Sequence, residues 1–228
     1  MSIVEFTDPI DIHSELNPNI WEGDHLRKDV QVALLKIAKE YYKFLDIDVT
    51  LMDLIVTGSQ ANYNYTKYSD LDLHLIVPYD SVQCDMAVDE LFKTKRDLWR
   101  SQRNISVKGV PVELYAEDIN EPVTGATYSV VKNEWLKKPT PIDATYDINE
   151  VKRLVELWER IIDKAIATEN LDVSRSVKDL LKTFRQAGLN KGGEMHPANL
   201  AFKSLRNDGY VGKLIDSIRS LTDRALSI

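Results

Sequence analysis

Two aspartates one residue apart, Asp70 and Asp72, open an apolar stretch that reads SDLDLHLIV. In a β-strand successive side chains point to opposite faces, so both carboxylates share one face while Leu71 and Leu73 take the other. Carboxylates a few ångströms apart repel, and each raises the pKa of the other unless a cation lies between them. Mg²⁺ suits such a pair because it binds oxygen ligands, through one or two carboxylates and substrate phosphates. The pair therefore predicts a divalent cation site.

A Gly-Ser pair, Gly58 and Ser59, ends the apolar stretch that comes before the aspartates. Glycine lets the backbone approach a phosphate closely, and turn N–H groups with the Ser59 hydroxyl can hydrogen-bond phosphate oxygens. The linker 60–69 follows and is rich in tyrosine and asparagine. Lys67, the one lysine between residues 54 and 77, either contacts a phosphate there or is simply solvated. A nucleotide-binding loop and a loop that only covers the domain edge both fit this linker.

A third acidic residue, Glu113, lies in the stretch VPVELYAED. Residues 105–116 have the form of a hairpin with a turn at Lys108-Gly109, and its second strand carries Glu113. A lone Glu in a strand usually faces solvent. Because the hairpin can bring Glu113 beside the strand of Asp70 and Asp72, we expect it to be a metal ligand. His74 shares the face of the aspartates and is expected to hydrogen-bond within the sheet.

These motifs together resemble the nucleotidyltransferase fold of the DNA polymerase β superfamily. The segment GSQANYNYTKYSDLDLHLIV looks closest to small predicted nucleotidyltransferases of tailed phages. The resemblance covers residues 24–118 and implies a mixed β-sheet backed by helices. Many members have Asp at the third acidic position, where Glu113 keeps the charge on a longer arm. The resemblance further implies that the catalytic and metal-binding residues are Asp70, Asp72 and Glu113.

The activity implied by the resemblance is transfer of a nucleoside monophosphate from a triphosphate, expected to be ATP, to a hydroxyl group, with release of pyrophosphate. Two Mg²⁺ ions, for which Mn²⁺ can substitute, serve such a site at a separation of about 4 Å. The acceptor stays open between an RNA 3′ end, a protein and a small molecule. Two alternatives also stay open: a nucleotide-binding module without turnover, and a different Mg²⁺-dependent enzyme such as a phosphohydrolase.

Bulk properties bound the class of protein. The chain has 228 residues, 43% hydrophobic and 29% charged, as in an ordinary globular protein. No apolar run approaches the roughly 20 residues of a membrane span, and the N-terminus has no secretory pattern, so we expect a cytoplasmic protein, in the host cytoplasm if a phage encodes it, with no membrane partner. Cys84 is the single cysteine, and the four histidines are too dispersed for a structural zinc site.

The net charge of −7 is unevenly distributed, because residues 174–228 are basic and the preceding part is acidic. A basic tail beside an acidic metal site could hold a triphosphate or an RNA backbone. By their position in this tail, Arg185, Lys182, Lys191 and Arg206 are candidates for pairing with the β- and γ-phosphates, and Arg185 is the one we select. A solvated helical face with no partner explains the same charges equally well.

The expected fold class is α+β, with a nucleotidyltransferase-type sheet followed by a C-terminal helical bundle. We expect a catalytic domain over residues 1–140, with an N-terminal arm at 1–23, and a helical domain over 147–228. The segment 137–147, rich in proline and turn formers, is the expected linker. Within the first domain, periodicity predicts a helix at 24–45 capped by Asp24, a strand at 49–57, a strand ending at Val77 and a helix at 81–103.

In the second domain the apolar periodicity predicts four helices. They cover 149–168, from Ser174 to about Gly188, 198–206 and 211–226, with a loop at 189–197. In the first domain, after a loop at 117–126, the segment TYSVVKNEWL fits either an edge strand or a short helix.

Overall fold

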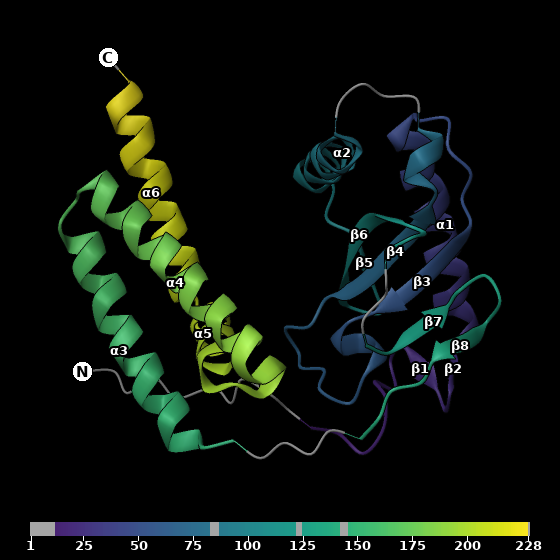
Figure 1. Ribbon diagram of the computed structural model, residues 1–228, viewed down its shortest axis with the longest axis horizontal. Coiled ribbons are helices and arrows are strands. Elements are labelled where there is room, and N and C mark those ends of the chain that lie inside the picture. The colour runs from purple at the N-terminus through teal and green to yellow at the C-terminus, as the bar shows by residue number, and fades with distance from the viewer. Residues whose placement is uncertain (1–11, 83–86, 122–124, 142–145, 228) are drawn as a thin grey trace. The chain divides into compact units, whose positions relative to one another are not determined.

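The chain folds into two compact units, which we call the sheet unit, Asp11–Ile142, and the helical unit, which includes Asp143–Ile228. The computed structural model describes residues 12–82, 87–121, 125–141 and 146–227 (Figure 1). The fold class is α+β, and the described residues form a mixed six-stranded sheet and six α-helices. None of the helices in the described ranges is long and apolar enough to cross a membrane. Cys84 lies outside the described residues.

The sheet has the strand order β5-β6-β4-β3-β7-β8, so β4 and β3 lie at its centre. β4 runs parallel to β6 and antiparallel to β3, and every other pairing is antiparallel. A parallel pair needs a crossover connection, and α2 supplies it between β4 and β6. The strands are β3 (Asp53–Thr57), β4 (Leu71–Val77), β5 (Ser106–Val107), β6 (Val110–Asp118), β7 (Thr127–Ser129) and β8 (Glu134–Lys137).

One face of the sheet is buried under α1 (Lys28–Leu45) and α2 (Val88–Gln102) (Figure 1). Leu71 and Leu73 of β4 are fully buried in this core. Tyr41 of α1 and Trp99 of α2 pack edge to face there, with ring centroids 5.2 Å apart. Because side chains alternate along a strand, the residues between these leucines face the other way. The face away from α1 therefore carries the polar side chains of β4 and β6.

The start of α1 differs from the prediction. The helix begins at Lys28, not at Asp24, and its N-cap residue has no side-chain capping bond. Two short strands, β1 (Trp21–Glu22) and β2 (His25–Leu26), pair before it. Asp24 lies in the turn between them, where its carboxylate contacts the Lys138 ammonium at 2.7 Å. The sequence pattern predicted Asp24 as the N-cap of this helix, but its side chain instead contacts Lys138, a residue far along the chain.

Other boundaries in the sheet unit also move. β3 begins at Asp53, so residues 49–52 are not part of the strand predicted at 49–57. The helix predicted at 81–103 is α2 and spans Val88–Gln102; residues 83–86 lie outside the described ranges. The segment TYSVVKNEWL forms the hairpin of β7 and β8, which decides between the strand and helix alternatives. Asn133 has a φ of 57° in the turn, a conformation that asparagine tolerates.

The helical unit consists of α3 (Ile148–Ala167), α4 (Leu171–Gly192), α5 (Pro197–Asn207) and α6 (Tyr210–Leu226). α4 begins earlier than predicted, because Asn170 caps it by accepting from the N–H groups of Asp172 and Val173. It also runs past Gly188 into the predicted loop. A Cβ at Gly188 would lie 2.7 Å from the Ala198 Cβ, so this glycine allows close helix packing and does not end the helix.

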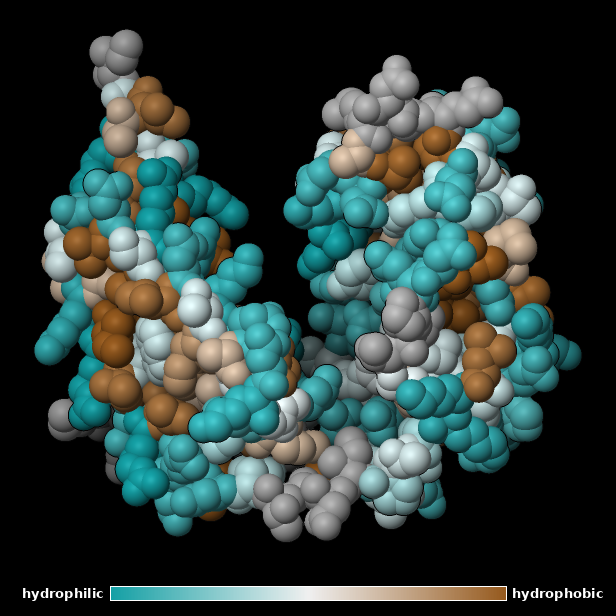
Figure 2. All heavy atoms as spheres, in the orientation of Figure 1, coloured by the Kyte–Doolittle hydropathy of each residue, from teal (hydrophilic) through white to brown (hydrophobic). Residues whose placement is uncertain are grey.

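Apolar side chains form a separate core inside the helical unit, centred on Trp158, Ile162 and Leu200. Figure 2 shows that the visible surface of both units is mostly hydrophilic, with hydrophobic residues exposed in patches. Leu157 of α3 and Leu180 of α4 are exposed by 44% and 60%. Each unit thus has a hydrophobic core of its own, and some large apolar side chains stay on the surface.

Leu73→Ala tests the central position of β4. We expect the free energy of unfolding to fall by about 3 kcal/mol, because a fully buried leucine leaves a cavity. Urea denaturation followed by tryptophan fluorescence measures the change. Val131→Ala is the control, since Val131 is 57% exposed and its truncation should cost less than about 0.5 kcal/mol. Equal losses in the two variants would contradict the assigned core.

Candidate functional site

The acidic residues predicted to form the site lie on neighbouring strands of the sheet. Asp72 is the register partner of Thr57 on β3 and of Glu113 on β6. Neighbouring strands are about 4.8 Å apart, and register partners on a parallel pair point to the same face. Glu113 therefore lies beside the strand of the aspartates, as predicted. Asp70 directly precedes the first residue of β4 and, like Asp72, is half-buried.

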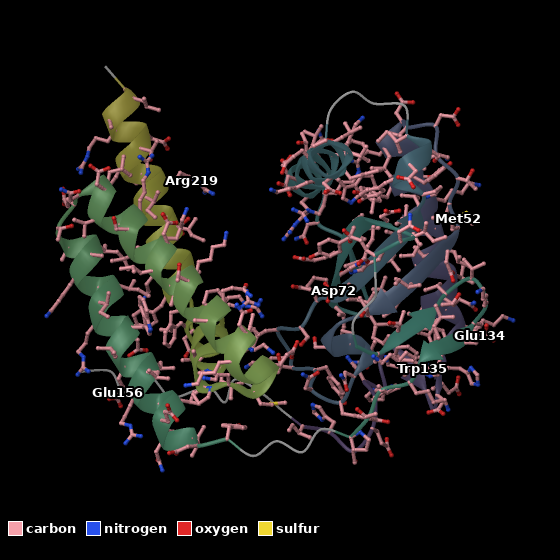
Figure 3. The ribbon with its side chains drawn as sticks, viewed as in Figure 1. Met52, Asp72, Glu134, Trp135, Glu156 and Arg219 are labelled. Atoms are coloured by element: carbon pink, nitrogen blue, oxygen red, sulfur yellow. The ribbon has the colours of Figure 1, made fainter. Side chains whose placement is uncertain are left out.

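The carboxylate of Asp72 lies against the backbone at Gly58. Gly58 follows β3 and has φ 72° and ψ −157°, a combination that is essentially restricted to glycine. A Cβ at this position would lie 2.0 Å from Oδ2 of Asp72. Figure 3 shows Asp72 on the side of the sheet away from α1. The glycine of the Gly-Ser pair is thus required for the carboxylate of Asp72 to occupy its place.

Glu113 is held by two side chains. The Arg100 guanidinium donates to Oε1 at 2.6 Å, and the Tyr115 hydroxyl donates to Oε2 at 2.5 Å. Burial, followed by this bond to the Glu113 carboxylate, raises the pKa of Tyr115 well above its ordinary value. The phenol therefore stays protonated and remains a donor. Arg100 and Tyr115 together fix the Glu113 carboxylate and balance part of its charge.

A second polar pair continues along the same face. His74 Nδ1 and Glu117 Oε2 are joined by a hydrogen bond of 2.5 Å, and the His74 ring stacks on Tyr115 with centroids 4.7 Å apart. Burial lowers the pKa of His74 below its ordinary value, and the Glu117 carboxylate offsets part of this effect. The expectation that His74 hydrogen-bonds within the sheet is confirmed. Through Tyr115, this pair adjoins the group that holds Glu113.

The three predicted metal ligands are not gathered into one ligand set. Among the described residues, no group of three or more His, Cys, Asp or Glu side chains is placed to hold a metal ion. The physical reason at Glu113 is its engagement with Arg100 and Tyr115. Asp70 and Asp72 still fit Mg²⁺, because this ion is usually held by one or two carboxylates plus substrate phosphates and not by an all-protein cage.

The nucleotide-binding candidates lie in different parts of the chain. Ser59 begins a short 3₁₀ turn, Ser59–Ala61, and is half-buried. Lys67 lies in the linker after it, with its ammonium 4.9 Å from the centre of the Tyr68 ring. Arg185 belongs to α4 in the helical unit and is not part of the sheet unit. Its Nε donates to Oδ1 of Asn199 at 3.2 Å.

Arg185 also stacks on the Phe202 ring, with Cζ 4.7 Å from its centre. Burial and the nearby Arg206 lower the pKa of Arg185 from its ordinary value. These contacts within the helical unit explain the placement of the Arg185 side chain without a ligand. Pairing of Arg185 with a triphosphate stays a prediction.

Sequence reasoning missed Arg100, Tyr115 and Glu117. The basic end of α2, which contains Arg100, is also explained by the helix dipole, so its charge alone gave no reason to connect it to Glu113. Tyr115 and Glu117 follow Glu113 at intervals of two residues on β6. This strand periodicity was the available signal, since it puts all three on one face.

Comparison of the chain with protein-family models, with curated proteins and with solved structures gives no match. The functional interpretation therefore depends on the residues and the geometry described above.

Gly58→Ala tests the contact with Asp72. We expect it to lower the free energy of unfolding by more than Gly109→Ala, because both glycines have positive φ but a Cβ at Gly109 meets nothing within 4 Å. Adding Asp72→Ala should recover part of the loss in Gly58→Ala, since the clash is then relieved while the backbone strain of an alanine at this φ and ψ remains. Chemical denaturation of the single and double variants measures this coupling, which is commonly about 0.5–3 kcal/mol for residues in contact. Purely additive losses would contradict the close approach.

Glu117→Gln tests the pairing with His74. Because the Glu117 carboxylate raises the pKa of His74 against the effect of burial, its removal should lower this pKa further. The signals of the His74 ring in a proton–carbon NMR titration measure the change, with His13, His25 and His196 as internal references. A His74 pKa that rises or stays constant in the variant would show that the two side chains do not interact as described.

Proposed function

We propose that this protein is a Mg²⁺-dependent nucleotidyltransferase that transfers a nucleoside monophosphate, expected from ATP, to an acceptor hydroxyl. The single observation that carries the proposal is the placement of Asp72. Its backbone pairs with Thr57 on one side and Glu113 on the other, and its carboxylate lies over Gly58. The Gly-Ser turn, the Asp-x-Asp strand and the third acidic strand thus lie next to one another in the sheet unit.

In this proposal Asp70 and Asp72 hold Mg²⁺, which when bound neutralises charge on the triphosphate and lowers the pKa of the acceptor hydroxyl. Gly58 and Ser59 contact phosphate oxygens. The acceptor oxygen forms a bond to the α-phosphorus while the bond from that phosphorus to the bridging oxygen breaks, so that pyrophosphate leaves. Glu113 takes the proton of the acceptor hydroxyl group, because its carboxylate lies on the same face of the sheet as Asp72, on the neighbouring strand.

The ion pair of Arg100 with Glu113 fits this proposal, in which the Glu113 carboxylate pairs with Arg100 before the triphosphate binds and with a cation afterwards. Arg100 is half-exposed, whereas the Glu113 side chain is 22% exposed, so the guanidinium can be displaced toward solvent while the carboxylate stays in place. A cation that arrives with the triphosphate would take over part of the charge balance that Arg100 supplies. Arg100 then acts as a positioning residue for Glu113.

Incubation with ATP labelled at the α-position, and separately at the γ-position, tests the reaction class. We expect label from the α-position to appear in an acceptor or a nucleotide product, and label from the γ-position to appear in pyrophosphate. Release of free phosphate would indicate a phosphohydrolase, and no turnover would indicate a binding module. Either outcome contradicts the proposal.

Asp70→Asn and Asp72→Asn should each abolish turnover while leaving the thermal midpoint unchanged or higher, because the repulsion of one carboxylate is relieved. Glu113→Gln should also abolish turnover. Asp80→Asn is the matched control, since Asp80 is exposed in the short turn Tyr79–Ser81 and should keep the wild-type rate. Initial rates and thermal unfolding of the same preparations provide the measurements. Retained activity in Asp72→Asn, or a large loss of stability without loss of activity, would overturn the assignment.

A further inference from the structure

A pocket of about 270 Å³ lies in the sheet unit where three separate segments meet. These are the stretch 13–19 before β1, the linker 60–69 and the turn at 108–110 that joins β5 to β6. Residues that line it include His13, Asn17, Gln60, Tyr65, Lys67 and Lys108. This volume is several times the ~30 Å³ share of one water molecule, so the pocket has room for a small ligand.

The pocket wall is fixed by hydrogen bonds between the segments. The backbone N–H of His13 donates to the carbonyl of Tyr63 at 2.8 Å. Gln60, only 1% exposed, accepts from the Asn17 side chain at 2.9 Å and donates to the carbonyl of Ser69 at 3.2 Å. The indole N–H of Trp21 donates to the carbonyl of Gln60 at 2.6 Å. These hydrogen bonds hold the stretch before β1 in place as one wall of the pocket.

The charged side chains of the pocket are basic. Lys67 and Lys108 line it, and among its described lining residues none is Asp or Glu. This contrasts with the acidic character of the sequence before residue 174. Lys108 is paired with Asp29 of α1, whereas the Lys67 ammonium lies over the Tyr68 ring. Such a lining favours a ligand that carries a phosphate group.

The same pocket offers a planar surface. The rings of His13 and Tyr65 are stacked with centroids 3.9 Å apart and an interplanar angle of 10°, and Nε2 of His13 hydrogen-bonds the carbonyl of Tyr65 at 3.0 Å. Stacking of a base on an aromatic ring is worth about 1–3 kcal/mol and does not depend on the identity of the base. A ring pair held rigid beside two lysines therefore matches both parts of a nucleotide, its base and its phosphate.

The pocket is connected to the candidate active site through the chain. Ser69 lines the pocket and directly precedes Asp70, and Gln60 follows Ser59. The hydrogen bond from Gln60 to the Ser69 carbonyl fixes the two ends of the linker to each other. We propose that this pocket binds a second nucleotide, the one that carries the acceptor hydroxyl, either free or as the terminal nucleotide of a single strand. This inference rests on the proposed transferase function.

Binding without metal tests the pocket separately from catalysis. A 5′-fluorescein-labelled adenosine trinucleotide is titrated in EDTA with the full chain, and unlabelled AMP is the competitor, with fluorescence anisotropy as the readout. We expect Lys67→Ala to weaken binding about tenfold, the range for loss of one charge-assisted hydrogen bond, and to reduce its salt dependence. Competition by AMP indicates a free nucleotide as the ligand, whereas binding of the trinucleotide alone indicates a strand end.

Two control variants make the test selective. Lys39→Ala removes an exposed lysine of α1 outside the pocket and should bind the trinucleotide like the wild type. Asp72→Asn should also bind it in EDTA. No binding by the wild type, or equal weakening in Lys67→Ala and Lys39→Ala, would overturn the pocket. Binding in EDTA together with absent transfer of the α-label would reject the acceptor role and the proposed transferase function, while the nucleotide site itself would stand.

Discussion

The carboxylate of Asp72 against the backbone of Gly58 is the contact on which the rest of the site depends. It requires a glycine at a positive φ directly after β3, and it requires β4 to pair with β3 in the observed register. A shift of one residue would turn Asp72 into the core and Leu71 and Leu73 out of it. Burial of these leucines under α1 and α2 therefore fixes the position of the acidic face as well as the stability of the sheet.

The polar face of β4 and β6 brings side chains of like charge close together. Asp72 and Glu113 are neighbours, and farther along β6 Glu117 follows on the same face. Both acidic residues on this face of β6 have a partner: Arg100 and Tyr115 for Glu113, and His74 for Glu117. Tyr115 contacts both groups, since its hydroxyl binds Glu113 and its ring stacks on His74. This network therefore fixes the positions of the Glu113 and Glu117 carboxylates.

Sequence reasoning reached the centre of the fold because its signals there are local. Alternation along SDLDLHLIV determines which side chains face the core, and the Lys108-Gly109 turn determines the hairpin that carries Glu113. The pairing of β4 with β6 also followed from the acidic residues. Asp24 shows where such reasoning fails, because its contact with Lys138 joins residues far apart in the sequence. Arg100 is a similar case, and so is Gly188, where packing against Ala198 decides the role of a glycine.

The most direct test is a crystal structure of the protein with Mn²⁺ and a non-hydrolysable ATP analogue, in which anomalous scattering locates the metal. Our account predicts a metal ion about 2.1 Å from carboxylate oxygens of Asp70 and Asp72, bridged to the phosphates, with the phosphates against Gly58 and Ser59. A metal or triphosphate bound elsewhere, with the Asp72 carboxylate outside the coordination sphere, would contradict it.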